Sequence, residues 1–442
     1  MPGMAGRILR DCFRARRITN TVKSSKRVIR SFVYIHSAAF FIFLPVKRFI
    51  FFGLLLFFPF FMQSQTKDDL QVSLLTVKPR PNAVWTIFGH TALRLYDPSR
   101  SIDMVLNWGT FDFEQPNFIV NFVLGKTDYF LSASTTQDFL YEYEYGNSTV
   151  IEQVLYIPDS LKMPLLQAME TNLQPKNIGY RYNIFFDNCT TRARDIIEEF
   201  CGGKWIYPIQ NESVTIRELM HSYTKPYPWL EFGIDFIIGS GADSLISQRT
   251  EMYLPEKLMA ILDRSVVGTS DGTEHQMVLS SKNILQSNND VNEKAGSFYI
   301  KPIVVTVILF LIYLSLIIIA YRKKRNFRLL FAFAFLIAGL GGCLIAELVF
   351  FSLHPCTSPN WNIVWIHPLQ LFASVGFLIK KYYKVFRWYH AVNFVLLSCF
   401  LVAWHWIPQG LNVAAIPLTG CLWLISGYQC MFLQRKNVEN KR

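Results

Sequence analysis

The side chains best suited to chemistry are a cysteine, a histidine and an asparagine in the first half of the chain. Cys189 follows the apolar run in "YNIFFDNCTTRARDIIEEF", and His90 lies in "WTIFGHTALRLYD". Asn107 lies in the next apolar segment, "SIDMVLNWGTFDF". A thiol, a base and a polar group that orients the base form the constellation of cysteine hydrolases. The residue types therefore allow nucleophilic catalysis by Cys189 if the fold brings the three together.

The sequence after Cys189 is typical of an amphipathic helix that ends at Gly202-Gly203. Its apolar face comprises Ala193, Ile196, Ile197 and Phe200. Cys201 follows twelve residues later, a helical rise of about 18 Å, whereas the α-carbons of a disulfide lie within roughly 7 Å. We therefore expect both cysteines to be unpaired. A helix N-terminus lowers the pKa of a thiol; the alternative role for Cys189 is that of a small buried residue.

Residues 64–300, which precede the apolar C-terminal segments, contain three candidate bases: His90, His221 and His275. His275 lies in a polar stretch that we expect to be a loop, and His221 lies near a predicted helix end, where it can act as a cap. His90 opens an alternating segment that predicts a strand, and Gly89 before it allows another backbone to approach closely. If the next strand is its neighbour in the sheet, Asn107 lies beside the His90 ring. A structural histidine is the alternative.

Five apolar segments near the C-terminus are long enough to cross a hydrocarbon core, which takes about 20 helical residues. They are 302–321, 329–353, 363–379, 388–406 and 411–433. The third is short and begins at His367-Pro368, which indicates a tilted helix or a start within the headgroup layer. Glu347 lies inside the second segment and is a candidate functional group, with pairing to a neighbour as the alternative.

The net charge of +12 is distributed unevenly. Residues 1–48 carry +10, residues 49–321 carry −9 and residues 322–442 carry +11. The soluble part has no basic patch, so the overall charge is no sign of nucleic-acid binding. Basic segments alternate with uncharged loops between the apolar segments, as the positive-inside rule requires. If the basic segments are cytosolic, residues of about 64–300 lie outside the inner membrane.

The N-terminus has the build of a signal peptide, preceded by an unusual basic prefix. Residues 49–65 contain an apolar core after Lys47-Arg48, followed by polar residues. We interpret residues 1–48 as an extension that arises from the choice of start codon; a genuine basic N-terminus is the alternative.

Three motifs and the C-terminal membrane segments together resemble the Lnb proteins of Bacteroidota. The motifs lie in "SLLTVKPRPNAVWTIFGHTALRLYD", "LNWGTFDFEQPNFIVNFVLGKTDYFLS" and "NLQPKNIGYRYNIFFDNCTTRARDIIE". The resemblance covers residues of about 70–435. Members of this family often have a cysteine where this chain has Val77, a difference that we expect to be tolerated because the histidine and cysteine motifs are intact.

The resemblance implies an α+β fold, a permuted papain-like domain of the NlpC/P60 and lecithin:retinol acyltransferase type. An all-α domain of five transmembrane helices follows it. The expected division is 1–48 extension, 49–65 signal peptide or anchor, 66–286 periplasmic catalytic domain, 287–300 linker, 301–434 transmembrane domain and 435–442 cytoplasmic tail.

The resemblance also implies a lipoprotein N-acyltransferase. Cys189, activated by His90, would take an acyl chain from a membrane phospholipid as a thioester, and the N-terminal amine of a diacylglyceryl lipoprotein would accept it. Asn107 would orient His90, and the backbone at Asp187 or Asn188 would assist the Cys189 N–H in stabilising the oxyanion. No cofactor or metal is expected. The alternatives are a membrane-tethered cysteine peptidase or amidase acting on cell-wall peptide, and a non-catalytic scaffold.

We expect substrate contacts from residues in the motifs and in the outer loop 354–368. The candidates are Arg94, Trp108, Phe118, Tyr182, His354, Asn362 and His367. The tryptophans of that loop are interfacial anchors or contacts to a headgroup or lipoprotein. Residues 116–130 form a core helix or, alternatively, an apolar surface that lines an acyl pocket or touches lipid.

Overall fold

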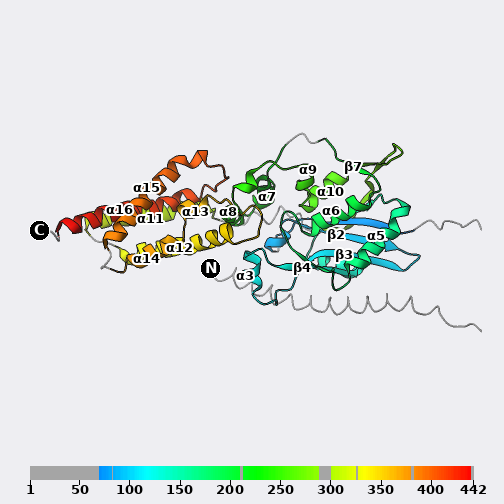
Figure 1. Ribbon diagram of the computed structural model, residues 1–442, viewed down its shortest axis with the longest axis horizontal. Helices are drawn as coiled ribbons and strands as arrows, with labels where there is room; N and C mark the ends of the chain where they lie inside the picture. Colours follow the sequence, from blue (N-terminus) through cyan, green and yellow to red (C-terminus); the bar gives the residue numbers. More distant parts are fainter. Residues whose placement is uncertain are drawn as a thin grey trace, which may run out of the picture.

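The computed structural model describes residues 69–439, except 82, 210–212, 288–299, 325–326 and 380–382. The expected extension and signal peptide, and most of the expected linker, lie outside the described residues. The molecule is elongated, with a mixed α/β domain at one end and a helical domain at the other (Figure 1). The strand-rich and helix-rich halves of the sequence thus fold separately.

A seven-stranded antiparallel sheet forms the centre of the α/β domain, in the order β10-β5-β1-β2-β3-β4-β6. Its strands are β1 (Gln71–Val77), β2 (His90–Asp97), β3 (Ile102–Thr110), β4 (Asp128–Thr135), β5 (Val150–Leu155), β6 (Gly179–Arg181) and β10 (Val278–Leu285). The predicted strands at 90–97 and 101–113 are confirmed as β2 and β3, and they are direct neighbours.

Alternation along β2 divides the apolar side chains between two cores. Leu93 and Leu95 belong to the larger core, to which α5 (Asp159–Asn172), α6 (Cys189–Phe200) and α10 (Pro255–Leu262) also contribute. Ala92 points to the other face and joins a smaller core under α4 (Thr136–Tyr145). Burying one such aliphatic side chain contributes about 1.5–3 kcal/mol, so the two faces fix the register of the strand.

The remaining elements of the α/β domain complete it around this sheet. They are η2 (Val84–Thr86), α3 (Phe118–Val123), β7 (Lys204–Ile206), α7 (Ile216–Thr224), α8 (Pro228–Ile237), η3 (Ser240–Asp243), α9 (Gln248–Glu251), β8 (Val266–Gly268) and β9 (Glu274–Gln276). Strands β7, β8 and β9 form a small second sheet. His275 lies in β9, stacked on Tyr156 at 4.4 Å between ring centroids, so the expected loop there is wrong.

The helical domain contains α11 (Pro302–Arg322), α12 (Arg328–Phe350), α13 (Asn362–Trp365), α14 (Leu369–Gly376), α15 (Tyr383–Ala403), η4 (Trp404–Trp406) and α16 (Ala415–Glu439). Within the described residues, three helices are long and apolar enough to cross a membrane, at Pro302–Arg322, Arg328–Phe350 and Val385–Trp406. The third predicted segment is instead two short helices, α13 and α14. The break falls at residues 366–368, where Pro368 lacks a backbone N–H and restricts His367 before it.

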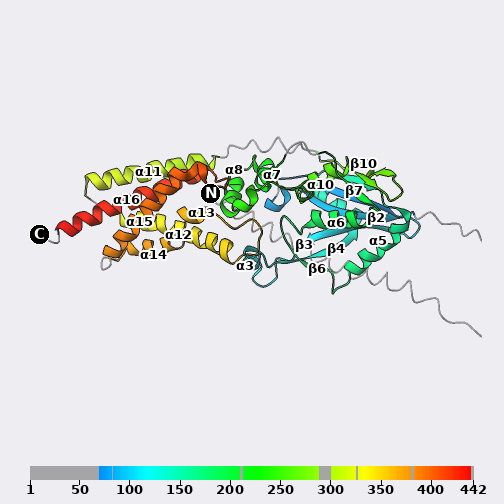
Figure 2. The ribbon, with the colours of Figure 1, turned by 45° about the horizontal axis from the view of Figure 1, so that its top comes forward.

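The two predicted uncharged loops of the helical domain contact the α/β domain. From the loop 354–362, the Cys356 carbonyl accepts the Gly239 N–H at 2.6 Å, and from the loop 407–410 the Gln409 side chain donates to the Ile238 carbonyl at 3.1 Å. Figure 2 shows α8 of the α/β domain against this end of the helices. These contacts place both uncharged loops on the side of the α/β domain.

The expected core helix at 116–130 is wrong. Only Phe118–Val123 is helical, as α3, and it has no buried residue. Ile119 is 76% and Val120 57% exposed. The apolar composition indicated a buried helix, but the segment lies at the edge of the sheet domain beside α12 (Figures 1 and 2).

Candidate active site

Cys189, His90 and Asn107 lie together at one end of the central strands. The Nε2 atom of His90 is 2.7 Å from the Oδ1 atom of Asn107. The thiol of Cys189 also hydrogen-bonds the His90 ring. Since Asn107 occupies Nε2, Nδ1 is the ring nitrogen left to share a proton with the thiol. The three residues named by the sequence thus form one connected group.

Two glycines with positive φ make this arrangement possible. Gly89, at φ 79°, precedes β2, and an added Cβ there would lie 2.6 Å from the Val77 carbonyl oxygen. Gly109, at φ 104°, faces the site: its added Cβ would meet the Cβ of Cys189 at 3.5 Å and Cε1 of His90 at 3.8 Å. The β3–β4 register shifts between Asn107 and Thr110, as expected for a bulge. The bulge and Gly109 together open the space into which the thiol projects.

Helix α6 begins at Cys189 because Asn188 caps it. The Oδ1 atom of Asn188 accepts the N–H groups of Thr190 and Thr191 at 2.8 and 2.9 Å, and its Nδ2 donates to the carbonyls of Ile184 and Tyr253. The unpaired N–H of the first helical residue and the helix dipole both favour a negative charge on the thiol. Cys201 is free and buried at the other end of α6, so the predicted absence of a disulfide is confirmed.

The electrostatics favour an ion pair between the thiol and the imidazole. Burial is the largest influence on Cys189 and acts to raise its pKa. The charge and hydrogen bond of His90, with smaller effects from the Thr91 N–H and the Thr190 hydroxyl, outweigh burial and lower the thiol pKa to about 7. Burial likewise disfavours the charged form of His90, but the charge and hydrogen bond of Cys189 and the Asn107 hydrogen bond raise its pKa above the ordinary value. A fraction of the thiol is therefore ionised at neutral pH.

The backbone at Asp187 and Asn188 is not available for an oxyanion. The Asp187 N–H donates to the Asn183 carbonyl at 3.0 Å, and the Asn188 N–H donates to the Thr191 hydroxyl at 2.8 Å. The Asp187 carboxylate pairs with Arg192. The Cys189 N–H has no acceptor among the residues that the structure describes, and it is the amide left to stabilise an oxyanion. The expectation that the backbone at Asp187 or Asn188 helps to stabilise the oxyanion is therefore wrong, because both N–H groups are used in the turn before α6.

Four tyrosines surround the thiol, and sequence reasoning found only one of them. They are Tyr129, Tyr143, Tyr180 and Tyr182. Burial and, secondarily, the charge on Cys189 raise the pKa of Tyr129 and Tyr182, so both stay neutral beside the thiolate. Tyr143 lies over the His90 ring, with centroids 6.4 Å apart. Tyr180 and Tyr182 lie two residues apart at β6, whereas Tyr129 and Tyr143 come from β4 and α4, so no single local sequence signal connects all four.

Two expected substrate contacts are structural instead. Trp108 is 1% exposed in the larger core, and its indole N–H donates to Asn172. The Arg94 guanidinium is held by Asp103 and Glu152 at 2.8 and 2.9 Å. It lies four residues along β2 from His90, a distance of about 13 Å. Both residues were predicted to contact substrate, but they stabilise the sheet domain instead.

The outer-loop candidates divide between two places. Asn362 is buried and donates to the backbone carbonyls of Asp235 and Phe236, so its side chain is part of the contact between the domains. His367 lies at the break between α13 and α14 and contacts Asn393 at 3.3 Å. Neither lies at the thiol. His354, by contrast, bonds the Phe122 carbonyl of α3 at 2.5 Å.

Tyr182 and Phe118 are the remaining candidates. Tyr182 packs, like Cys189, against the larger core, where burial raises the tyrosine pKa and the charge of Cys189 raises it further. Phe118 is half-buried in α3. Val77 is buried directly opposite His90 on β1, in the smaller core. Its side chain fills apolar space there, which agrees with the expectation that the residue difference is tolerated.

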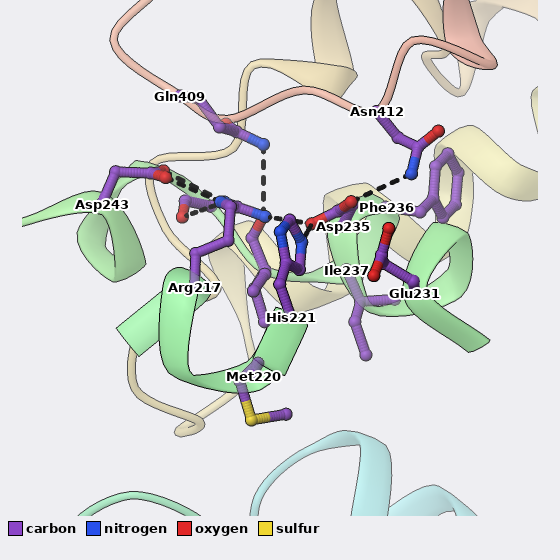
Figure 3. A network of polar contacts seen from close by, with 12 residues as sticks. Arg217, Met220, His221, Glu231, Asp235, Phe236, Ile237, Asp243, Gln409 and Asn412 are labelled. Carbon is purple, nitrogen blue, oxygen red and sulfur yellow. Dashed lines mark hydrogen bonds and ion pairs between the residues drawn. The ribbon is translucent and has the colours of Figure 1, made fainter. Parts of the chain in front are cut away.

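A second polar cluster lies away from the thiol. Asp235 accepts from Arg217 and His221 at 2.8 Å each and from Asn412 at 3.0 Å (Figure 3). His221, Glu231 and Asp235 have the residue types and proximity of metal ligands. Because both oxygens of Asp235 already bind donors, among them a buried arginine, we interpret the cluster as an ionic joint between the domains.

Two further features lie apart from the thiol. A pocket of about 350 Å³ is lined by Arg80, Tyr223, Glu256 and Lys257, among others, but not by Cys189 or His90. Glu347 is half-buried near the end of α12, and its carboxylate has no hydrogen-bond or ion-pair partner within the described parts of the chain.

Two family models match this architecture. The model of the Lnb N-terminal periplasmic domain matches residues 60–222, and that of the Lnb transmembrane domain matches residues 293–437. The chain belongs to the Lnb family. The first match includes all three members of the Cys189–His90–Asn107 group. Searches of curated proteins and of solved structures found no match.

Membership in the Lnb family makes this a membrane-bound enzyme of lipoprotein maturation with a periplasmic region. The mixed α/β domain followed by a helical domain with three long apolar helices agrees with this assignment. Membrane and lipoprotein are accordingly the surroundings in which the chemistry of Cys189 has to be understood.

Proposed function

We propose that this protein is a lipoprotein N-acyltransferase of the bacterial inner membrane that works through a Cys189 thioester. The observation that carries the proposal is the hydrogen-bonded group of Cys189, His90 and Asn107, in which the thiol pKa falls to about 7. A thiolate beside an imidazolium is an activated nucleophile. The family supplies the context of lipoproteins and membrane.

In the first step, the Cys189 sulfur attacks the carbonyl carbon of a phospholipid ester. The oxyanion of the tetrahedral intermediate lies toward the free Cys189 N–H at the N-terminus of α6. The ester C–O bond breaks, and His90 gives its proton to the departing lysophospholipid oxygen. The acyl chain remains on Cys189 as a thioester.

In the second step, the N-terminal amine of a diacylglyceryl lipoprotein attacks the thioester. His90 takes the proton of the amine, the C–S bond breaks, and an amide forms while the thiolate is restored. Over both steps one proton moves from the amine to the lysophospholipid hydroxyl. Asn107 keeps the His90 ring in one orientation throughout through its hydrogen bond at 2.7 Å.

The test uses cells that lack their own enzyme for this step. Mass spectrometry of lipoprotein N-termini should show N-acylation when the wild-type protein is expressed and free amines with Cys189→Ser. Cys201→Ser is the matched control, since Cys201 is a free, buried cysteine at the other end of α6, and it should behave like wild type. Free amines with the wild-type protein would refute the proposal and favour a peptidase or scaffold; N-acylation by Cys189→Ser would refute the nucleophile.

A further inference from the structure

A row of aromatic rings connects α3 to the surroundings of Cys189. We define the aromatic row as Phe122, Phe118, Phe111, Tyr129 and Tyr182. Successive ring centroids lie 6.3, 5.6, 4.9 and 4.1 Å apart. The row ends in the surroundings of Cys189. Tyr129 precedes Phe130, which pairs with Thr110 of β3, and the neighbouring Gly109 faces the Cys189 side chain. The charge of Cys189 also acts on both Tyr129 and Tyr182.

Exposure decreases along the row from Phe122 to Tyr129. Phe122 is 38% exposed, Phe118 and Phe111 are half-buried, and Tyr129 is 7% exposed, while Tyr182 and Cys189 are half-buried. The outer end therefore opens to the surroundings, and the row is most shielded from water at Tyr129. An aliphatic chain that followed the rings would pass from an open apolar surface past a buried ring to the thiol.

The outer end of the row belongs to a larger apolar surface. Next to Phe122, the α3 residues Ile119 and Val120 are mostly exposed. Phe113, which contacts Phe118 with centroids 5.0 Å apart, is 39% exposed, and Trp85, which contacts Phe113, is 57% exposed. A soluble domain rarely exposes so many large apolar side chains together unless they meet a partner or a membrane.

Hydrogen bonds fix this surface to the end of a membrane helix. The Ser352 hydroxyl donates to the Val123 carbonyl at 2.8 Å, and the Leu353 N–H donates to the Leu124 carbonyl at 2.9 Å. The ring of His354 meets that of Phe122 edge-on at 5.7 Å. These three residues directly follow α12.

The end of α12 is itself exposed and apolar. Phe350, Phe351 and Leu353 are 68%, 65% and 62% exposed. Because α12 is long and apolar enough to span a membrane, this end lies at the level where the hydrocarbon meets the headgroups. The apolar surface of α3 is thus continuous with a lipid-facing surface, which identifies lipid as its occupant.

We propose that the aromatic row is the path by which one acyl chain of a bilayer phospholipid reaches Cys189. The ester carbonyl lies at the thiol, the chain follows Tyr129 and Phe111, and its methyl end remains near Phe118 and Phe122. The proposal rests on the proposed acyl transfer for its biological meaning. The binding path itself is testable without any turnover.

The first experiment maps the lipid in the full-length Cys189→Ala variant, which cannot form a thioester. The protein is placed in nanodiscs with phosphatidylethanolamine that carries a photoreactive diazirine either near the acyl carbonyl or near the methyl end. We expect the carbonyl-proximal probe to label peptides with Tyr129 or Tyr182, and the methyl-end probe to label those with Phe118 or Phe122. Labelling confined to α11–α16 with both probes would overturn the path.

The second experiment introduces a charge at the outer end of the row. Phe122→Asp should reduce labelling of the row at least tenfold, whereas the apolar Phe122→Leu should retain it. Tyr145→Asp is the matched control, because Tyr145 is 72% exposed on α4, over the smaller core. Unchanged labelling in Phe122→Asp, or equal losses in Phe122→Leu and Tyr145→Asp, would contradict the path.

A third measurement distinguishes a loss of lipid binding along the row from misfolding of the site and from a loss of acyl transfer. In the background that keeps Cys189, water-soluble iodoacetamide should alkylate Phe122→Asp as fast as wild type, since the reagent does not need the row. Labelling along the row together with free lipoprotein amines in wild-type cells would retain the lipid path and remove the acyl transfer. N-acylation without labelling of the row would retain the acyl transfer and remove the lipid path.

Discussion

Gly109 provides the space in which Cys189 and His90 meet, and Asn107 fixes the direction of the ring. The thiol has a low pKa because His90 lies beside it and the helix begins at its own residue. Burial acts in the opposite direction on both partners. The reactivity of Cys189 therefore depends on a balance between desolvation and one charged neighbour, and small changes around it should be measurable.

The pH dependence of alkylation tests this balance. Only the thiolate attacks iodoacetamide, so we expect the rate at Cys189 to rise with pH through a midpoint near 7, where its pKa lies. In His90→Ala, burial remains and the main lowering influence is lost, so the midpoint should move above the ordinary thiol value of about 8.5. Peptide mass spectrometry gives both rates. Buried Cys201, whose thiol pKa burial raises, should stay unmodified; an unchanged midpoint in His90→Ala would contradict the pairing.

A methyl group at Gly109 should harm the reaction more than the fold. At φ 104° an alanine is strained, at a cost of about 1–3 kcal/mol, and its Cβ would press on both Cys189 and His90. Gly272→Ala is the matched control, because Gly272 also has a positive φ, 84°, but nothing within 4 Å of an added Cβ. We expect similar losses in thermal stability but at least a tenfold loss of acyl transfer in Gly109→Ala alone. Equal activities would mean that Gly109 has no role at the site.

At the scale of elements, the position of Cys189 depends on how α6 begins. The Asn188 side chain makes four hydrogen bonds, two to the first turn of α6 and two to the carbonyls of Ile184 and Tyr253. It therefore joins the helix to two other segments as well as capping it. The cap is a positioning element for the nucleophile rather than part of the oxyanion site.

Removal of this cap should destabilise the domain more than removal of an ordinary one. Thr135→Ala removes the exposed cap of α4 and should cost about 1 kcal/mol of unfolding free energy. Asn188→Ala also leaves buried carbonyls unpaired, so we expect a loss of about 2–4 kcal/mol. The alkylation midpoint of Cys189 should rise at the same time, because the helix end frays. Chemical denaturation and alkylation rates measure the two effects, and equal losses in both variants would reduce Asn188 to a simple cap.

Sequence periodicity predicted β2, β3 and α6 because each buries one regular face. It failed for α3, since composition does not say whether an apolar segment faces a core or a membrane. The apolar run before Cys189 forms a turn, in which the Asn183 side chain accepts the N–H groups of Phe185 and Phe186. Cys189 and His90 could be singled out because cysteine and histidine are rare in the domain, and Asn107 because it lies on the next strand. The tyrosines around them come together only in the fold.

At the scale of the whole molecule, the ionic joint determines how the catalytic domain is placed over the helices. Arg217 and Asp235 are 4% and 3% exposed at their side chains. Asn412 and Gln409, from the loop before α16, bond Asp235 and the Ile238 carbonyl. On the proposed lipid path, a membrane lipid reaches Cys189 only if α3 remains at the end of α12. The ionic joint and the contact between α3 and the end of α12 thus both fix the orientation of the α/β domain relative to the helices.

Breaking the ionic joint should reduce the access of lipid to Cys189 without changing the reactivity of its thiol. Asp235→Ala leaves Arg217 with Asp243 as its one carboxylate partner, beside the Ile238 and Gly239 carbonyls. It also leaves His221 and Asn412 without this acceptor. Loss of one partner of a buried pair costs about 3–5 kcal/mol, and the Asn412 hydrogen bond from the helical domain is lost with it. We expect acyl transfer from bilayer phospholipid to fall at least tenfold while alkylation of Cys189 stays within twofold of wild type.

Hydrogen exchange reports directly on this contact. The N–H groups of Gly239 and Ser240 donate to the Cys356 and Pro359 carbonyls across the joint at 2.6 and 2.8 Å. In Asp235→Ala these two amides should exchange faster, whereas Asn412→Ala, which removes a single hydrogen bond to the same carboxylate, should have a smaller effect. If both amides remain protected in Asp235→Ala and transfer still falls, Asp235 acts through the fold of α8 rather than through the orientation of the domains.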